Sequence, residues 1–314
     1  MSEIPAGFHG RRYHAYADWV KEKFGTRLQK ISINAGFTCP NRDGKVGYGG
    51  CSFCDNSSFT PYYTRSSGIE EQIEKGLTFL KKRYRKAGKF LGYLQSYSNT
   101  YGSKDDLIRV YEKILSHPEI SGLVIGTRPD CIDREVVNLL ESLSEENIIQ
   151  VELGLESCYD QTLGEINRGH DFKRSIEAIR LLKETEIHVT AHFILGLPGE
   201  NFDMLVDQVK LINSLGIDSV KFHQLQIIKG TKMASQYRKG HIYVFELNEY
   251  LDLLSEIIAR LDPAITIQRL VTEAPASKKI APAWGLKTEE FLNKLDEMLT
   301  QKSIFQGKNY TFGS

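Results

Sequence analysis

Hydrophobic and polar positions follow two alternating patterns along most of the chain. Short apolar runs of the kind that form buried strands occupy residues 28–34, 90–94, 122–126, 148–153, 188–194 and 219–225. Stretches with the apolar spacing of amphipathic helices follow these runs, at residues 68–86, 104–116, 133–145, 172–185, 201–214 and 246–261. Strands that alternate with helices form a parallel sheet covered by helices. We therefore predict an α/β fold, an incomplete (β/α)6 TIM-type barrel with six units rather than eight.

The two ends of the chain lie outside this alternation. Residues 8–24 are aromatic and basic at helical spacing, which predicts a short helix against the body. Residues 267–277 predict a last strand and a loop that close the barrel mouth. We therefore expect an N-terminal extension over 1–27, a partial barrel over 28–262 and a C-terminal closing extension over 263–314.

The composition is that of an ordinary soluble globular protein, with 41% hydrophobic and 25% charged residues in a chain of 314. No apolar run approaches the roughly 18 residues that a membrane-spanning helix needs, and the N-terminus lacks a signal-peptide core. We therefore expect a cytoplasmic protein with no membrane partner. In that compartment the five cysteines are expected to be metal ligands or free thiols rather than disulfides.

Charge is unevenly distributed although the net charge is zero. Basic residues outnumber acidic ones in the first hundred positions and the reverse holds afterwards, which points to a polyanionic partner. Residues 81–89 are strongly basic and are either a solvated helix end or an RNA backbone contact. An aromatic and basic group near the N-terminus could stack on RNA, although a packed helix explains it equally well: Arg11, Arg12, Tyr13 and Tyr16.

Three cysteines follow the first predicted strand: Cys39, Cys51 and Cys54, spaced C-x11-C-x2-C. The long arm between the first two contains four glycines, which let it fold back and bring Cys39 beside the others. Structural zinc sites use four ligands, and neither a nearby histidine nor a second cysteine pair is present. Three thiolates on a four-iron cluster leave one iron open to a substrate or cofactor. We favour such a cluster; a zinc site and unligated cysteines stay open as alternatives.

Polar residues follow the apolar runs, at the strand ends where α/β barrels gather their functional groups. They form the clusters 95–101, 126–131, 152–157, 167–171, 196–200 and 229–231. Taken singly, several of these clusters also fit helix caps or turns. Glu152 stands within an apolar run, where an unsatisfied carboxylate is costly. A ligand that carries ribose hydroxyls and an ammonium group would satisfy it.

The cysteine loop and these strand ends, in this order, resemble the radical S-adenosylmethionine (SAM) superfamily. The resemblance extends from Gln29 to Gly230, and within the superfamily it is strongest to the catalytic domain of the elongator tRNA-modifying subunit. The long cysteine spacing departs from the superfamily's common C-x3-C-x2-C and is similar to that branch and to a small bacterial family. The resemblance implies a [4Fe–4S] cluster on Cys39, Cys51 and Cys54, with SAM bound to the fourth iron.

The resemblance also implies which residues hold SAM. Gln95, Ser98 and Asn99 match the motif that contacts the methionine amino group. Glu152 and Arg168 match positions near the ribose and the methionyl carboxylate. The positions beside adenine are matched by Phe53, Ile194, Gly196, Leu225, Gln226 and Ile227.

The chemistry implied by the resemblance is reductive cleavage of SAM to a 5′-deoxyadenosyl radical, which abstracts a hydrogen atom from the substrate. An electron donor such as a flavodoxin or a ferredoxin-like protein is then required. The resemblance implies a tRNA partner and, more narrowly, remodelling of the C5 side chain of a wobble uridine. Inward-facing polar residues near the last strands would bind the substrate or form a structural salt bridge: Lys221, His223, Arg269 and Glu273.

Three other functions remain as alternatives. The protein could be a radical SAM oxidase or decarboxylase of a small molecule such as a porphyrinogen. It could be a non-enzymatic iron–sulfur sensor or RNA-binding module, or a structural protein that binds zinc. Cys131 and Cys158 are isolated in the sequence, and we expect them to be buried or unremarkable residues rather than ligands or a radical relay.

Overall fold

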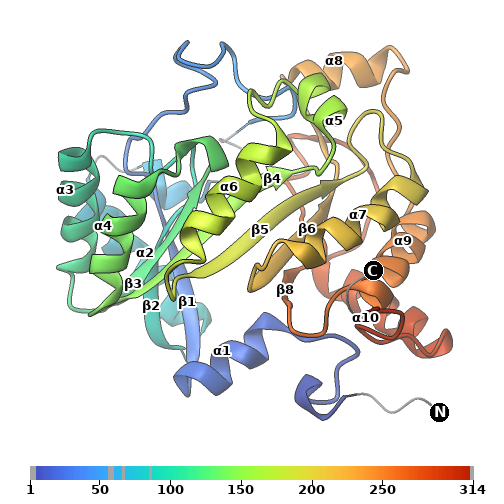
Figure 1. The fold of residues 1–314 in the computed structure, drawn as a ribbon, viewed down its shortest axis with the longest axis horizontal. Coiled ribbons are helices and arrows are strands. Elements are labelled where there is room, and N and C mark those ends of the chain that lie inside the picture. The colour runs from blue at the N-terminus through green and yellow to red at the C-terminus, as the bar shows by residue number, and fades with distance from the viewer. Residues whose placement is uncertain (1–4, 56–59, 66–67, 85–86, 312–314) are drawn as a thin grey trace.

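The computed structural model describes residues 5–55, 60–65, 68–84 and 87–311, and a parallel sheet forms its centre (Figure 1). Seven strands lie side by side in the order β1-β2-β3-β4-β5-β6-β8. They are β1 (Arg27–Ile33), β2 (Ala87–Leu94), β3 (Ile120–Thr127), β4 (Ile148–Glu156), β5 (His188–Leu195), β6 (Ser219–Gln224) and β8 (Thr266–Arg269). All neighbouring pairs are parallel. The sheet curls into a half-barrel, which confirms the predicted incomplete α/β barrel.

The strand number differs from the prediction, because the sheet has seven strands rather than six. The additional strand, β8, is the short strand that we predicted in the C-terminal tail. It extends the sheet beyond β6, where Ser219 is paired with Thr266, and it is not paired with β1. The half-barrel therefore stays open between β1 and β8 instead of closing by backbone pairing.

Helices cover the outer face of the sheet (Figure 1). They are α2 (Ile69–Arg83), α3 (Lys104–Leu115), α4 (Arg134–Ser144), α6 (Phe172–Leu182), α7 (Phe202–Ser214) and α9 (Leu247–Arg260). Four of them start at a residue whose side chain accepts a hydrogen bond from the backbone three positions later: Ser103, Asp133, Asp171 and Asn201. Their apolar faces pack on the sheet and form one continuous core with it.

Several short elements escaped the sequence analysis. They are η1 (Ala6–Phe8), η3 (Tyr62–Arg65), η4 (Pro129–Cys131), α5 (Asp160–Glu165), α8 (Lys232–Arg238) and the antiparallel pair β7 (Ile227–Ile228) and β9 (Lys279–Ala281). Elements of seven residues or fewer are too short to show a hydrophobic period. The longer C-terminal helix α10 (Thr288–Gln301) was also not assigned, although its pattern is amphipathic.

The N-terminal helix α1 (Tyr16–Phe24) packs against both β1 and β8, beside the open side of the half-barrel (Figure 1). It starts later than the predicted residue 8. The residues before α1 form the short helix η1, a turn and bends, and they contact the C-terminal part of the chain: Ile267 donates its backbone N–H to His14 O at 2.8 Å. Arg12 Nε donates to Thr300 Oγ1 at 2.8 Å. Both ends of the chain therefore pack on the half-barrel.

The basic run 81–89 lies at the end of the barrel away from the cysteine loop. It spans the end of α2 and the start of β2, whereas the cysteine loop follows the carboxyl end of β1. Lys81 forms an ion pair with Glu119, and residues 85–86 lie outside the described residues. Tyr16, another predicted RNA contact, donates to Gln150 Oε1 at 2.7 Å. Lys81 and Tyr16 thus contact other parts of the same chain, and for Tyr16 this agrees with a packed N-terminal helix. Among the described residues, no helix combines the length and apolar character needed to cross a bilayer.

Candidate active site

A cavity of about 240 Å³ lies at the carboxyl ends of the strands. Because the strands are parallel, their carboxyl ends meet at the same end of the half-barrel. Thirteen of the predicted site residues line this cavity: Cys39, Cys51, Phe53, Cys54, Gln95, Ser98, Glu152, Arg168, Ile194, His223, Leu225, Gln226 and Arg269. The structure thus brings together groups that are up to 230 positions apart in the sequence.

The cysteine loop forms one wall of the cavity. The loop turns back on itself at three glycines with left-handed backbone angles, Gly44, Gly49 and Gly50. Gly50 donates its N–H to Asn41 O at 2.8 Å, which holds the long arm folded. The fold of this arm places Cys39 on the same cavity wall as the closely spaced pair at 51 and 54.

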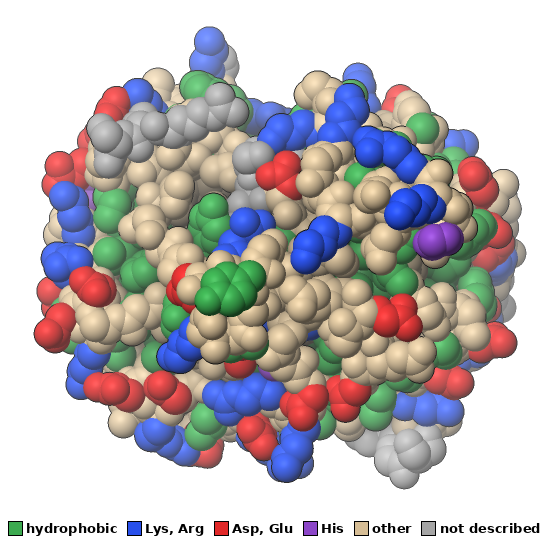
Figure 2. Space-filling model, turned by 90° about the horizontal axis from the view of Figure 1, so that it is seen from above, with side chains coloured by type: hydrophobic (Ala, Val, Ile, Leu, Met, Phe, Trp, Pro, Cys, Tyr) green, Lys and Arg blue, Asp and Glu red, His purple; other side chains and the backbone are tan. Residues whose placement is uncertain are grey.

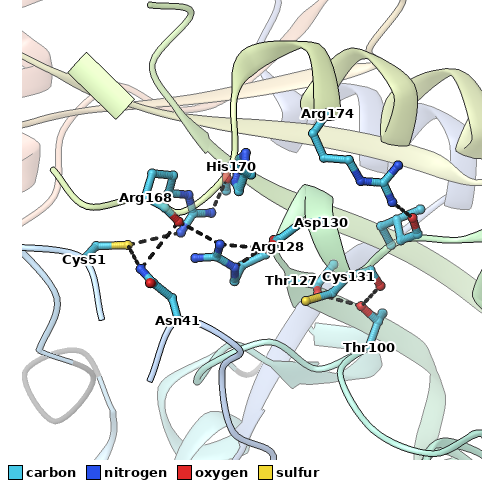
Figure 3. Close-up of polar contacts among 12 residues, drawn as sticks. Asn41, Cys51, Thr100, Thr127, Arg128, Asp130, Cys131, Arg168, His170 and Arg174 are labelled. Atoms are coloured by element: carbon cyan, nitrogen blue, oxygen red, sulfur yellow. Dashed lines mark hydrogen bonds and ion pairs between the residues drawn. The ribbon is translucent and has the colours of Figure 1, made fainter. Parts of the chain in front are cut away.

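The donor groups on this wall fit an iron–sulfur cluster. Cys51 Sγ lies 3.5 Å from Arg168 Nη1 and 3.7 Å from Asn41 Nδ2, so two N–H groups face a sulfur that would carry negative charge (Figure 3). No three His, Cys, Asp or Glu side chains in the described part of the chain surround a single ion. The thiolates of a four-iron cluster bind separate irons and need not converge on one point, whereas zinc ligands must.

Arg168 is held in place by a second arginine. Its backbone carbonyl accepts a hydrogen bond from Arg128 Nη2 at 2.7 Å, and its own Nη2 donates to Gly154 O (Figure 3). Arg128 in turn forms a bidentate pair with Asp130, at 2.8 and 2.9 Å. Burial disfavours the charged carboxylate, but this pair keeps the pKa of Asp130 below its usual value. The network connects the cysteine loop to the ends of β3 and β4.

Glu156, at the end of β4, occupies a strained position beside Arg168. The pairing of β4 with β5 shifts register between Gly154 and Glu156, and Glu156 adopts a left-handed φ of 72°. Such a conformation is unfavourable for a residue with a side chain and is often found at functional sites. The carboxylate lies 3.7 Å from Arg168 Nη2, and burial raises its pKa. Glu156 belongs to the polar cluster 152–157 predicted at a strand end, and no role was predicted for it.

Glu152 lies on the cavity floor with both carboxylate oxygens already bound by the protein. Oε1 accepts from Lys30 Nζ and from Lys221 Nζ, each at 2.6 Å. Oε2 accepts from the Tyr93 hydroxyl at 2.7 Å and lies 3.2 Å from His192 Nε2. Burial opposes the charge of Glu152, but the two lysines hold its pKa well below the usual value. The protein itself therefore satisfies this carboxylate, so the predicted ribose ligand is not needed to do so.

Three of the predicted SAM contacts lie outside the cavity lining: Asn99, Gly196 and Ile227. Asn99 is buried and donates through Nδ2 to Leu94 O at 3.0 Å and to Gly126 O at 2.8 Å, which ties β2 to β3. Gly196 adopts a φ of 90° and packs against Phe245, where a Cβ would lie 2.8 Å from the ring. Asn99 and Gly196 shape the backbone around the cavity rather than its surface, and Ile227 is fully buried in β7.

Two predicted substrate residues, Lys221 and Glu273, also lie outside the lining. Lys221 is buried and lies behind the cavity surface, where it contacts Glu152 and the ring of Tyr93. Glu273 forms an ion pair with Lys279 at 3.3 Å and does not line this cavity with Arg269. The tail turns there, because its strand ends at Arg269.

The cavity contains further polar and aromatic residues to which the sequence analysis assigned no role: Arg42, Tyr93, Tyr97, Arg128, Glu156 and His192. Arg128 and Tyr97 lie in the polar clusters after β3 and β2, so their position at strand ends was a usable signal. His192 and Tyr93 lie within apolar runs. A polar side chain in a strand faces inward or outward according to its register, which a single run does not reveal.

Comparison with known proteins agrees with this arrangement. Residues 34–212 match the family model described as the Radical SAM superfamily, and residues 217–301 match the Radical_SAM C-terminal domain. Uncharacterized protein MJ0486 of Methanocaldococcus jannaschii is 34% identical over 306 residues, which cover 96% of this chain and 93% of that protein. A tRNA uridine(34) acetyltransferase of Methanocaldococcus infernus is 28% identical over 159 residues, 49% of this chain and 29% of that protein.

Among solved structures, the chain is similar to Elp3 of Methanocaldococcus infernus with its N-terminus deleted. The TM-score is 0.67 at 18% identity, and the match covers 89% of this chain and 64% of that one. At this identity the likeness concerns the fold. The family match and the relatives together show that the chain belongs to the radical SAM superfamily, whose enzymes use a [4Fe–4S] cluster and SAM.

Proposed function

We propose that this radical SAM enzyme acts on tRNA and remodels the C5 side chain of a wobble uridine in the cavity described above. The observation that carries the proposal is that the cysteine loop faces polar strand ends within one cavity, whose lining also includes Arg42 and Tyr97. When bound, the cluster and SAM supply a 5′-deoxyadenosyl radical that can abstract a hydrogen atom from an unactivated C–H bond.

Under this proposal the side chains around the cysteine wall orient SAM. Cys39, Cys51 and Cys54 hold the cluster, and Arg168 stands beside Cys51 to attract the methionyl carboxylate. Ser98 is fully buried and lines the cavity, where its Oγ can accept a hydrogen bond from the methionine amino group. Gln95 and Glu156 add polar contacts, and the adenine would pack on apolar side chains: Phe53, Ile194 and Leu225.

The rim of the cavity supports an RNA substrate. Arg42 and Tyr97 both line the cavity, and Arg42 lies over the ring of Tyr97 at 5.8 Å. Lys45 lies over the ring of Tyr101 at 5.2 Å in a second pocket, which follows β2 and β3. Tyr48, in the same cysteine loop, is 77% exposed. Exposed aromatic rings interleaved with cations bind unpaired bases and the phosphates between them. Figure 2 views this end of the molecule and shows Lys and Arg side chains gathered on one part of the face.

The first experiment tests the radical chemistry. Protein reconstituted anaerobically with iron and sulfide is mixed with SAM and dithionite, which replaces the flavodoxin or ferredoxin-like donor. We expect 5′-deoxyadenosine from the wild type and from Cys158→Ala, whose thiol is buried in the core away from the cavity. Cys51→Ala is expected to fold but to lose cluster absorbance and 5′-deoxyadenosine. Product from Cys51→Ala would show that this ligand assignment is wrong.

The second experiment tests the substrate. The modified nucleosides of bulk tRNA are compared by mass spectrometry between a strain that lacks the protein and its parent. We expect one uridine derivative to differ, and purified enzyme with SAM is expected to restore it. Identical nucleoside profiles would end the tRNA proposal and leave a small-molecule substrate as the better explanation. Cluster binding without SAM cleavage would instead favour a non-enzymatic sensor.

A further inference from the structure

The floor of the cavity carries a row of polar side chains that β-sheet register places side by side. His192 on β5 is paired with Lys221 on β6, and Lys221 is paired with Arg269 on β8. Paired residues of neighbouring parallel strands point to the same face, which here is the inside of the half-barrel. The pairing shifts between Val220 and Lys221, so β8 has one residue more than β6 at this point. A bulge of this kind turns a side chain toward a site.

The charges of this floor do not balance. Lys30, Lys221 and Arg269 face a single carboxylate, that of Glu152. Glu152 is 2% exposed and Lys221 is 4% exposed, so solvent screens them weakly. Arg269 pairs with no carboxylate in the part of the chain that the structure describes. The neighbouring histidines add no balancing charge.

The two histidines on the floor are neutral at physiological pH. Burial and Lys221 lower the pKa of His192 to about 4, and burial and Arg269 lower that of His223 to about 3. Burial, together with Lys30 and Arg269, also lowers the pKa of Lys221 well below its usual range, although Glu152 opposes this. Two further cations thus surround a lysine that already has Glu152 as its counter-ion, so the floor carries more positive groups than negative ones.

We propose that the floor of the cavity binds an oxyanion of the substrate, a phosphate or a carboxylate, with Arg269 as its principal partner and Lys221 behind it. The proposal rests on the proposed function in one respect, that the substrate enters this cavity. The guanidinium of Arg269 presents a planar fork of N–H groups, the geometry that phosphates and carboxylates accept in a bidentate manner.

A purely structural ion pair does not explain the arrangement. Glu152 already has two lysines, a tyrosine hydroxyl and His192 as partners. One of the two lysines alone would neutralise the charge of its carboxylate. Both lysines also lie over the ring of Tyr93, at 5.2 and 5.4 Å, so they are held at fixed positions. Arg269 contributes to none of these contacts, and it lines the cavity instead. Its charge is therefore available to a ligand.

Equilibrium dialysis of the anaerobically reconstituted holoenzyme with SAM tests the proposal. The probes are radiolabelled inorganic phosphate and radiolabelled acetate, at constant ionic strength in chloride. We expect at least one probe to bind once per chain, and Arg269→Met to weaken this binding about tenfold or more. Arg269→Lys keeps the charge but loses the fork, and we expect an intermediate affinity. Arg180→Met, an exposed arginine on the outer helix α6, serves as the matched control and is expected to bind like the wild type.

Each outcome has one meaning. Binding of phosphate that depends on Arg269 indicates a substrate phosphate, and binding of acetate alone indicates a substrate carboxylate. No binding of either probe, or equal binding by the wild type and Arg269→Met, overturns the proposal. If Arg269→Met does not fold, Arg269→Lys decides instead. Binding of phosphate and acetate by Arg269→Lys with the same affinity as the wild type then overturns the proposal. SAM cleavage by the same wild-type preparation is measured in parallel, so a failure of the radical chemistry is separate from a failure of anion binding.

Discussion

At the scale of single residues, the neighbours of a side chain decide its role more than its type does. Glu152 and Glu156 lie four positions apart on β4 and both line the cavity. Glu152 is bound by two lysines and its pKa is lowered, whereas burial raises the pKa of Glu156. The first is a fixed structural charge, and the second is the carboxylate that a ligand can reach. Their residue type and their position in one motif do not distinguish them.

Arg168 offers a test at this scale, because its guanidinium lies 3.5 Å from Cys51 Sγ. A cation and an N–H donor beside a cluster sulfur stabilise the more negative, reduced cluster. We expect Arg168→Met to lower the midpoint potential of the cluster, by about 60 mV for each 1.4 kcal/mol of stabilisation lost. The measurement is a redox titration followed by EPR, without SAM.

Arg180→Met is again the control for this titration, since it removes an exposed arginine far from the cysteine loop. An unchanged potential in Arg168→Met, with the cluster bound in full, would contradict a role for the guanidinium in stabilising the reduced cluster. A readout of potential is needed because loss of activity alone would also follow from a structural disturbance.

At the scale of elements, the fold depends on close packing between helices and strands that local preferences do not reveal. Gly76 lies inside α2, where glycine is among the least favourable helix residues. A Cβ at this position would lie 2.4 Å from Ile31 Cγ2 on β1 and 3.3 Å from the ring of Tyr63. Helix α2 can therefore lie close to β1 only because this residue has no side chain.

We expect Gly76→Ala to destabilise the protein by about 1–3 kcal/mol, since the overpacking outweighs the gain in helix propensity. Gly164→Ala in α5 is the matched control, because no atom lies within 4 Å of the added methyl group. The control is expected to be neutral or to stabilise the protein by up to about 1 kcal/mol. Urea denaturation of the cluster-free protein measures both, and a Gly76→Ala variant as stable as the control would refute the packing argument.

At the scale of the whole molecule, the first and last segments of the chain are joined around one buried amide. Gln306 is fully buried. Its Oε1 accepts from His14 N at 2.9 Å, and its Nε2 donates to Asp262 O at 2.7 Å and to Ile265 O at 2.8 Å. These bonds fasten the residues before α1 and the loop before β8, and so support both sides of the open barrel edge.

Replacing this amide tests whether the ends belong to the same folding unit as the barrel. We expect Gln306→Ala to cost about 2–4 kcal/mol in the free energy of unfolding, because three buried backbone groups lose their partner. Gln301→Ala, exposed at the end of α10, should change stability by less than about 0.5 kcal/mol. A single urea transition that shifts as a whole is expected for Gln306→Ala. A separate early transition would show that the ends unfold independently of the barrel.

The half-barrel and the cysteine loop could be predicted from the chain alone, since both depend on local features. Apolar runs of strand length, helical periodicity and the spacing of Cys39, Cys51 and Cys54 are properties of neighbouring residues. Because functional groups of α/β barrels gather at the carboxyl ends of the strands, the polar residues after each apolar run then indicated where most cavity residues would lie. The short helices α5 and α8 escaped because six or seven residues do not complete a readable period.

Tertiary structure alone decided which polar groups meet inside the half-barrel. Asn99 turned out to tie two strands together, and Glu273 to pair with Lys279, although both follow strands as the other site residues do. Bulges at Gly154–Glu156 and beside Lys221 change which side chains face inward, and only the pairing of distant strands shows them. The unbalanced cations on the cavity floor come from β1, β6 and β8, so their excess charge exists only once the sheet has curled and brought these strands together.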